Sequence, residues 1–305
     1  MGLQVIQAFT QSQVNIALLH GYGSLTHGIS SGDTDIVVDR PPAQALRACR
    51  PRLRALGLRP IAIWPYDLGG TVSVFLTDST ASIGVHLDLL YDPTGLGRYG
   101  LMSDALLARR EMRDGIPVIA QEAEVIYLWR KRIAKNQLDR LPALTAQAQA
   151  LSEEALKKAA ASMLGSHHVA CDVLVGRPRR MRRSHRLRLG PRVTRLQDRI
   201  RKPVGYWVHW PQADPATVEQ VATRFERILP DVTIHHYPCG LRRSWMVWIK
   251  DIAPARWRAA LVLTHGEGHV SSYQPSPDLL LPNQSDDPVI AARQIVQAMG
   301  SRIHV

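Results

Sequence analysis

Aspartates lie directly before one short apolar run near the start of the chain and inside another, and this placement limits the folds open to the sequence. Asp33 and Asp35 precede the β-branched run at residues 36–38, and Asp88 lies inside the run VHLDLLY. An unpaired charge such as Asp88 on a core strand is costly, so that strand end is expected to open onto a site. The sequence therefore predicts a sheet in which two strands carry the three carboxylates.

Strand and helix patterns alternate along the rest of the chain. Apolar and β-branched runs predict strands at 14–20, 35–38, 59–64, 70–76, 83–91, 203–210 and 244–250. Helical spacing and capping residues predict helices at 42–57, 103–115, 121–141, 214–229 and 286–300. The fold class is therefore α/β (α+β). Four parts are expected: an α/β domain at 1–115, a helical subdomain at 116–176, an Arg-rich linker at 177–202 and a smaller α/β domain at 203–305.

Composition places the chain among globular proteins. It has 305 residues, of which 45% are hydrophobic and 21% charged, enough to fill two cores. No stretch approaches the roughly 18 apolar residues of a membrane span, and the first residues lack the pattern of a secretory signal. The three cysteines share no metal-binding or disulfide spacing. We expect a cytoplasmic protein with no membrane partner.

The formal net charge of +12 is concentrated in one stretch. Residues 177–202 hold twelve of the 38 Lys and Arg residues and a single acid, Asp198. Such a run is typical either of a solvated linker or of an arm that follows nucleic acid phosphates. Nucleic acid binding through this stretch is therefore the alternative to a linker.

The spacing of the aspartates indicates metal chemistry. Asp33 and Asp35 are two residues apart, so on a strand both point to the same face, where they would repel each other without a cation. With Asp88 from a neighbouring strand they suit two Mg²⁺ ions, about 3.5–4 Å apart, that clamp the attacking and leaving oxygens of a phosphoryl transfer. Gly23 and Ser24 would cradle phosphate oxygens if a helix begins there.

A structural role for the same residues is the alternative. Asp33 could bond its own backbone in a turn, and Asp88 could be the buried partner of an Arg. The conjunction of three carboxylates with a Gly-Ser turn favours the metal site.

The segments GYGS, DTDIVV and HLDLLY together resemble the signature of the polymerase β-type nucleotidyltransferase superfamily. Over about residues 12–202 the chain is similar to nucleotidyltransferase domains that are fused to a thymidylate kinase-like domain. The resemblance implies a polymerase β-like sheet with appended helices and a kinase-like C-terminal domain. It also implies transfer of a nucleoside monophosphate from an NTP, such as ATP, to an acceptor hydroxyl, amine or phosphate, with release of pyrophosphate.

The resemblance assigns roles to seven residues. They are Asp33, Asp35 and Asp88 for catalysis and Mg²⁺, Gly23 and Ser24 for the triphosphate, and Lys131 and Lys135, either of which would reach a phosphate from the following helix.

Two departures from the family pattern keep other functions open. Only eight residues separate Ser24 from Asp33, and in a register shifted by two the second aspartate would be Val37. That register describes a catalytically inactive nucleotide-binding or scaffold protein. The loop at 211–217 has neither glycine nor lysine, so the kinase-like domain is expected to be degenerate. The Arg-rich stretch gives the third possibility, an RNA-binding, toxin-type transferase that acts on tRNA.

Overall fold

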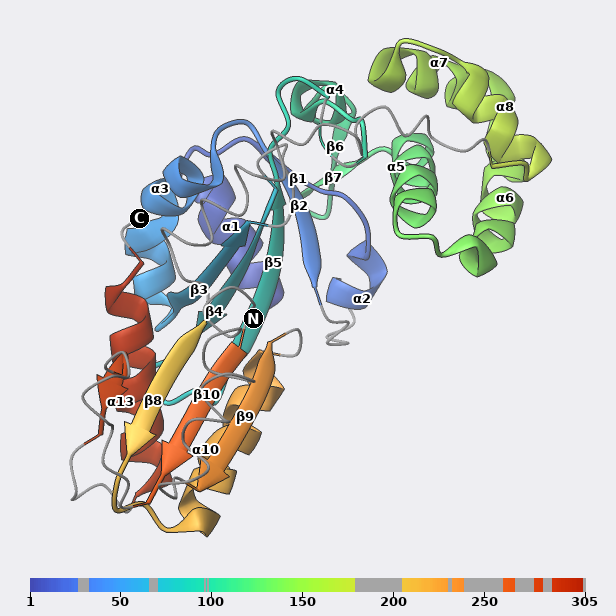
Figure 1. Ribbon diagram of the computed structural model, residues 1–305. Helices are drawn as coiled ribbons and strands as arrows, with labels where there is room; N and C mark the ends of the chain where they lie inside the picture. The colour runs from blue at the N-terminus through green and yellow to red at the C-terminus, as the bar shows by residue number, and fades with distance from the viewer. Residues whose placement is uncertain are drawn as a thin grey trace.

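The structure is a computed structural model. It describes residues 1–26, 33–65, 71–95, 97, 99–178, 205–229, 232–238, 260–266, 277–281 and 287–303. Within these residues a seven-stranded and a four-stranded sheet are packed with helices (Figure 1). The predicted mixed α/β class is confirmed.

The seven-stranded sheet is mixed, in the order β3-β4-β5-β2-β1-β7-β6. Its strands are β1 Ile16–Leu18, β2 Thr34–Val38, β3 Arg59–Pro65, β4 Val72–Thr77, β5 Gly84–Leu90, β6 Arg110–Arg113 and β7 Ile116–Ile119. β2 runs parallel to β5, and β1 runs parallel to β7, whereas the other neighbours are antiparallel.

Helices α1 (Gly2–Gln11) and α3 (Pro42–Ala55) cover one face of this sheet (Figure 1). Alternate strand residues such as Ile36, Val74 and Leu87 bury their side chains against the apolar sides of both helices. This is the pattern expected of strands whose successive side chains point to opposite faces. The face opposite to these helices is therefore the one available for a site.

That opposite face is covered at both ends. At one end Leu19, Val37 and Leu90 join a core formed with α4 (Ser103–Leu107), α5 (Gln121–Ala134), α6 (Leu141–Gln149), α7 (Glu153–Leu164) and α8 (His168–Val175). The short helix η1 (Leu138–Arg140), between α5 and α6, has no buried residue. At the other end Ile61 and Phe75 join the core of the C-terminal elements. The polar residues of the sheet lie between these two apolar covers.

The four-stranded sheet is entirely parallel, in the order β11-β8-β10-β9. Its strands are β8 Tyr206–Trp210, β9 Thr233–Pro238, β10 Ala260–His265 and β11 Leu279–Leu280, and its helices are α10 (Pro215–Ile228) and α13 (Pro288–Ser301). In Figure 1 this part, in yellow to red, lies beside β3, β4 and β5. A Cβ on Gly84 would lie only 2.7 Å from the Cα of Ile228, so glycine permits the close approach of β5 to α10.

The helix predicted at 103–115 is wrong beyond its first turns. α4 ends at Leu107, and β6 and β7 then form an antiparallel hairpin. Asp114 and Gly115 both have positive φ, 48° and 77°, as the two central residues of a tight hairpin turn require. The first sheet therefore extends to Ile119, beyond the boundary predicted at residue 115.

The predicted helix starts in the C-terminal part are confirmed. Asp214 caps α10 by accepting a hydrogen bond from the Thr217 backbone N–H, and a proline occupies the first helical position. Asp287 caps α13 in the same way, through Val289. The strand predicted at 244–250 and the Arg-rich stretch from residue 179 to 202 lie outside the described residues. Within the described part, no helix combines the length and the apolar character that crossing a membrane requires.

Candidate active site

The three predicted aspartates lie together at the middle of the first sheet. Asp35 on β2 and Asp88 on β5 are register partners across a parallel pair of strands. Asp33 immediately precedes β2 and is two residues from Asp35. One carboxylate oxygen of each aspartate lies within 4.8 Å of the other two, although Asp35 and Asp88 are only 3% and 6% exposed.

The register of β2 explains which residues reach this cluster. Val37, which the shifted register would put in place of the second aspartate, is fully buried among apolar side chains. Ile36 and Val38 pack in the core beneath α1 and α3. Side chains alternate along the strand, so Asp33 and Asp35 share the opposite face with Val37. The aspartates lie at the start of that face, and Val37 follows them in the core formed with the helical part.

Asp35 is held by two basic side chains. Lys131 Nζ, from α5, and His20 Nε2, just after β1, both contact Oδ2 of Asp35. The two nitrogens are 3.1 Å apart. Burial raises the pKa of Asp35, but the hydrogen bond from His20 and the charge of Lys131 outweigh it and hold that pKa well below its usual range. Asp35 is therefore an ionised carboxylate.

The surroundings of Lys131 are also buried. Its side chain is 4% exposed. Nζ lies 5.7 Å from the ring centroid of Tyr127, whose ring is stacked with that of His20. Burial, followed by the negative charge of Asp35, raises the pKa of Tyr127 far above its usual value. Tyr127 is therefore a neutral phenol whose ring lies beside the ion pair of Lys131 and Asp35.

Asp88 is oriented by its neighbours in the sheet. Ser73, its register partner on β4, donates a hydrogen bond from Oγ to Oδ1 of Asp88 at 2.5 Å. His86 Nε2 lies 3.4 Å from the same oxygen, and the His86 ring stacks on Phe75 with centroids 4.2 Å apart. These contacts restrict the rotation of the Asp88 carboxylate.

Sequence reasoning did not find His20, Ser73 or His86. His20 is the polar residue that ends the first predicted strand, and Ser73 and His86 are polar residues inside apolar runs. Ser73 and His86 resemble Asp88 in being polar residues within an apolar run. Their partners depend on strand register, which that signal does not contain.

The other predicted residues lie at different places. Gly23 is exposed within α2 (Tyr22–Thr26), and a Cβ at this position would meet no atom within 4 Å. The side chain of Ser24 lies outside the described part. Lys135 is the C-cap residue of α5, one turn beyond Lys131. Of the two predicted lysines, Lys131 is therefore the one that the structure joins to Asp35.

The donor set fits a hard divalent cation. Carboxylate oxygens are the ligands that Mg²⁺ takes from proteins, and three of them converge here. Asp35 and Asp88 already receive hydrogen bonds that fix their orientation. Pre-oriented ligands of this kind are what metal sites require.

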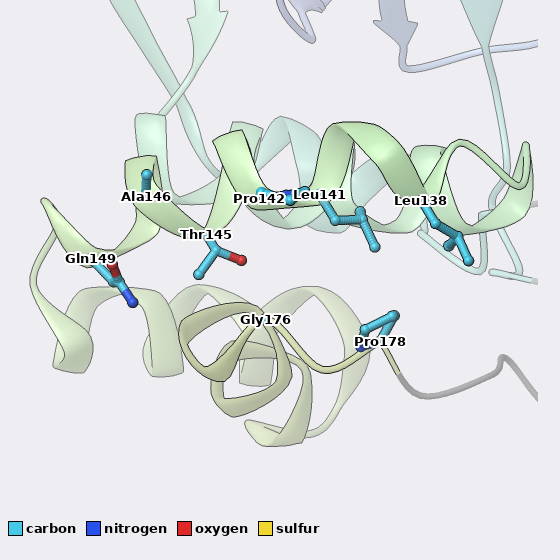
Figure 2. A pocket seen from close by; sticks show the side chains of 8 residues that line it. All are labelled: Leu138, Leu141, Pro142, Thr145, Ala146, Gln149, Gly176 and Pro178. Carbon is cyan, nitrogen blue, oxygen red and sulfur yellow. The ribbon is translucent and has the colours of Figure 1, made fainter.

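The cavity in Figure 2 lies elsewhere, between α6 and the residues that follow α8. Its volume is about 390 Å³, and it is lined by Leu138, Leu141, Pro142, Thr145, Ala146, Gln149, Gly176 and Pro178. None of these residues is charged. The cavity is therefore unsuited to a triphosphate.

The carboxyl edge of the four-stranded sheet has a different character. Thr264 Oγ1 accepts a hydrogen bond from Trp207 Nε1 at 3.0 Å and lies 2.9 Å from His209 Nδ1. Burial lowers the pKa of both His209 and His265. The Asp214 carboxylate occupies the N-terminus of α10, the position where a kinase-like loop would hold phosphate.

Comparisons of the chain with protein-family models, with curated proteins and with solved structures found no match.

Proposed function

We propose that the protein is a Mg²⁺-dependent nucleotidyltransferase of the polymerase β type, which moves a nucleoside monophosphate from an NTP to an acceptor. One observation carries the proposal: Asp33, Asp35 and Asp88 converge on one face of the sheet, beside a buried lysine. Three carboxylates and a basic side chain are the groups that phosphoryl transfer to an acceptor requires.

The three aspartates would have different roles in holding the metal ions. Asp33 and Asp35 would hold the ion that accompanies the triphosphate, and Asp88 would share the second ion on the acceptor side. Bound Mg²⁺ supplies neutralisation of the charge that develops on the phosphate oxygens. The acceptor oxygen, nitrogen or phosphate oxygen bonds to the α-phosphorus, the bond to the β-phosphate oxygen breaks, and pyrophosphate leaves.

Asp88 is the group suited to take the proton from an acceptor hydroxyl or amine. A general base must be held within hydrogen-bonding reach of that proton. Ser73 and His86 restrict the carboxylate through Oδ1, so its orientation is set before the acceptor arrives. Preorganisation of this kind lowers the reorganisation needed during transfer.

A second candidate is a catalytically inactive nucleotide-binding or scaffold protein. The observation that favours it is the buried contact between Lys131 and Asp35, which neutralises a predicted metal ligand with a side chain of the same chain. An RNA-binding, toxin-type transferase would depend on the Arg-rich stretch, most of which lies outside the described residues.

Metal-dependent nucleotide binding separates these candidates. Melting temperature is measured with each NTP, with and without Mg²⁺, and the protein is incubated with each labelled NTP and Mg²⁺ in the presence of cell extract. A transferase shows a Mg²⁺-dependent shift with at least one NTP and a labelled product. A shift with no product supports the inactive protein, and the absence of any Mg²⁺-dependent shift contradicts the transferase.

A further inference from the structure

A lysine occupies the place of a cation in the aspartate cluster. Lys131 Nζ contacts Oδ2 of Asp35, and that carboxylate lies with those of Asp33 and Asp88 inside one 4.8 Å group. Both partners of the contact are almost fully buried, at 3% each. The ammonium group therefore supplies the positive charge that the buried Asp35 carboxylate needs.

A divalent cation on Asp35 and the ammonium of Lys131 compete for the charge of one carboxylate. Lys131 contacts Oδ2, and in a buried site a second cation on the same carboxylate is strongly repelled by the ammonium. A triphosphate removes the conflict because it offers Lys131 another anionic partner. The length and flexibility of the lysine stem allow this exchange without a shift of α5.

We propose that Lys131 holds the place of the metal on Asp35 until nucleotide arrives and then transfers to the phosphates. The inference rests on the proposed nucleotidyltransferase function and concerns the regulation of its site. Free metal binds weakly because it must displace Lys131, whereas metal that arrives with nucleotide binds tightly. The site therefore has a low affinity for a divalent metal ion in the absence of nucleotide.

The role of Lys131 can be separated from a merely structural one by the direction of two effects. Lys131→Gln keeps a donor for Asp35 but removes the charge. Free Mn²⁺, followed by electron paramagnetic resonance, is expected to bind this variant about tenfold more tightly than the wild type. The Mn²⁺ complex of α,β-methylene-ATP is expected to bind it about tenfold more weakly, because the partner of the phosphates is lost.

Two further variants act as controls. Lys131→Arg keeps the charge and is expected to bind free Mn²⁺ no more tightly than the wild type. Lys158→Gln removes an exposed lysine from α7 and is expected to leave both affinities unchanged. If Lys131 serves only to stabilise the fold, Lys131→Gln should weaken the binding of free Mn²⁺ and of the Mn²⁺–nucleotide complex together.

A measurement on the wild-type protein tests the same exchange if Lys131→Gln does not fold. Acetylation of Lys131 by acetic anhydride, followed by mass spectrometry, is expected to be slow in the metal-free protein. Saturating Mg²⁺ alone should accelerate it at least threefold, and further addition of α,β-methylene-ATP should slow it again. A rate that Mg²⁺ does not change overturns the exchange.

The outcomes also separate this inference from the proposed function. If the wild type binds the Mn²⁺–nucleotide complex but Lys131→Gln shows no gain in affinity for free Mn²⁺, the exchange is wrong and the transferase stands. If the wild type binds neither Mn²⁺ nor its nucleotide complex, the proposed function itself is wrong.

Discussion

The two sheets of this protein gather polar residues in opposite ways. In the first sheet three carboxylates converge, and one of them is neutralised by a buried lysine from a separate helix. In the second sheet Trp207, His209 and Thr264 satisfy one another through hydrogen bonds, and Asp214 caps its own helix. The difference indicates how a candidate ligand site can be recognised. It holds more charged side chains than local hydrogen bonds can satisfy, whereas polar residues at a strand end are not enough.

The largest effect should come from removing charge in the first sheet. Asp35→Asn or Asp88→Asn is expected to reduce nucleotidyl transfer by about 10²–10³-fold or more, because groups that hold charge in a transfer site are worth at least that much. Asp33→Asn and Asp35→Asn should also weaken Mg²⁺-dependent NTP binding, whereas Asp88→Asn should spare much of it. Initial rates and calorimetric titration measure the two effects.

The matched control for these variants lies in the second sheet. Asp214→Asn makes the same chemical change at the start of α10 and is expected to leave transfer unchanged. Equal losses in Asp88→Asn and Asp214→Asn would contradict the contrast between the sheets.

The next effect concerns the core that joins the sheets. Phe225 on α10 is fully buried in a cluster that also contains Phe75 from β4. Phe225→Ala is expected to cost about 3–5 kcal/mol of unfolding free energy, because it removes apolar contacts and leaves a cavity. Phe9→Ala, in the core beneath α1, should cost a similar amount.

Chemical denaturation followed by both fluorescence and circular dichroism tests whether that core couples the sheets. A single transition that both variants shift is expected, since the Phe225 cluster contains residues of both sheets. Two separate transitions, each shifted by one variant alone, would show that the sheets are independent.

Acid should act on the second sheet through its buried histidines. Burial lowers the pKa of His209 and His265 in the folded state, so the unfolded chain binds protons more readily. Their contribution to stability is therefore complete above the unfolded pKa, about 6.5, and is lost as the pH falls from there through the folded pKa. Urea denaturation at several pH values should show this loss.

The histidine variants identify the source of the acid effect. His209→Asn keeps an amide near the position of Nδ1 but cannot take up a proton, so its stability should depend less on pH below about 6.5. His168→Asn, at an exposed site on α8, should keep the pH dependence of the wild type. An unchanged slope in His209→Asn would assign the effect to other groups.

Much of the candidate site followed from the sequence because its signals are local. Asp33 and Asp35 share a face through strand alternation, and Asp88 stands out as a charge in an apolar run. Helix starts at Asp214 and Asp287 also follow from capping chemistry within a few residues. Local chemistry of this kind can be read without knowing the fold.

Features that depend on distant partners could not be predicted. Residues 103–113 have helical spacing, yet residues 110–113 form β6, which pairs with β7. β7 in turn joins the sheet through β1, about a hundred residues earlier. The sequence placed Lys131 on a helix but did not show that the helix docks it onto Asp35. In the same way, Ser73 reaches Asp88 only through the register of β4 with β5.

The smallest effect should come from the cap of α10. Asp214→Ala removes the acceptor for the Thr217 backbone N–H and is expected to cost about 1 kcal/mol of unfolding free energy, within the range of about 0.5–2 kcal/mol for such caps. Asp214→Ser keeps an acceptor and should restore most of that loss.

Neither change should create ATP binding, because the loop still lacks the glycines and the lysine that a phosphate site requires. Denaturant midpoints measure the first effect. Calorimetry with ATP and Mg²⁺ measures the second, by comparing an Asp33→Asn, Asp214→Ala double variant with Asp33→Asn alone. Tighter ATP binding by the double variant would show that the Asp214 carboxylate was masking a phosphate site in the second sheet, and a single side chain would then account for the difference between the two sheets.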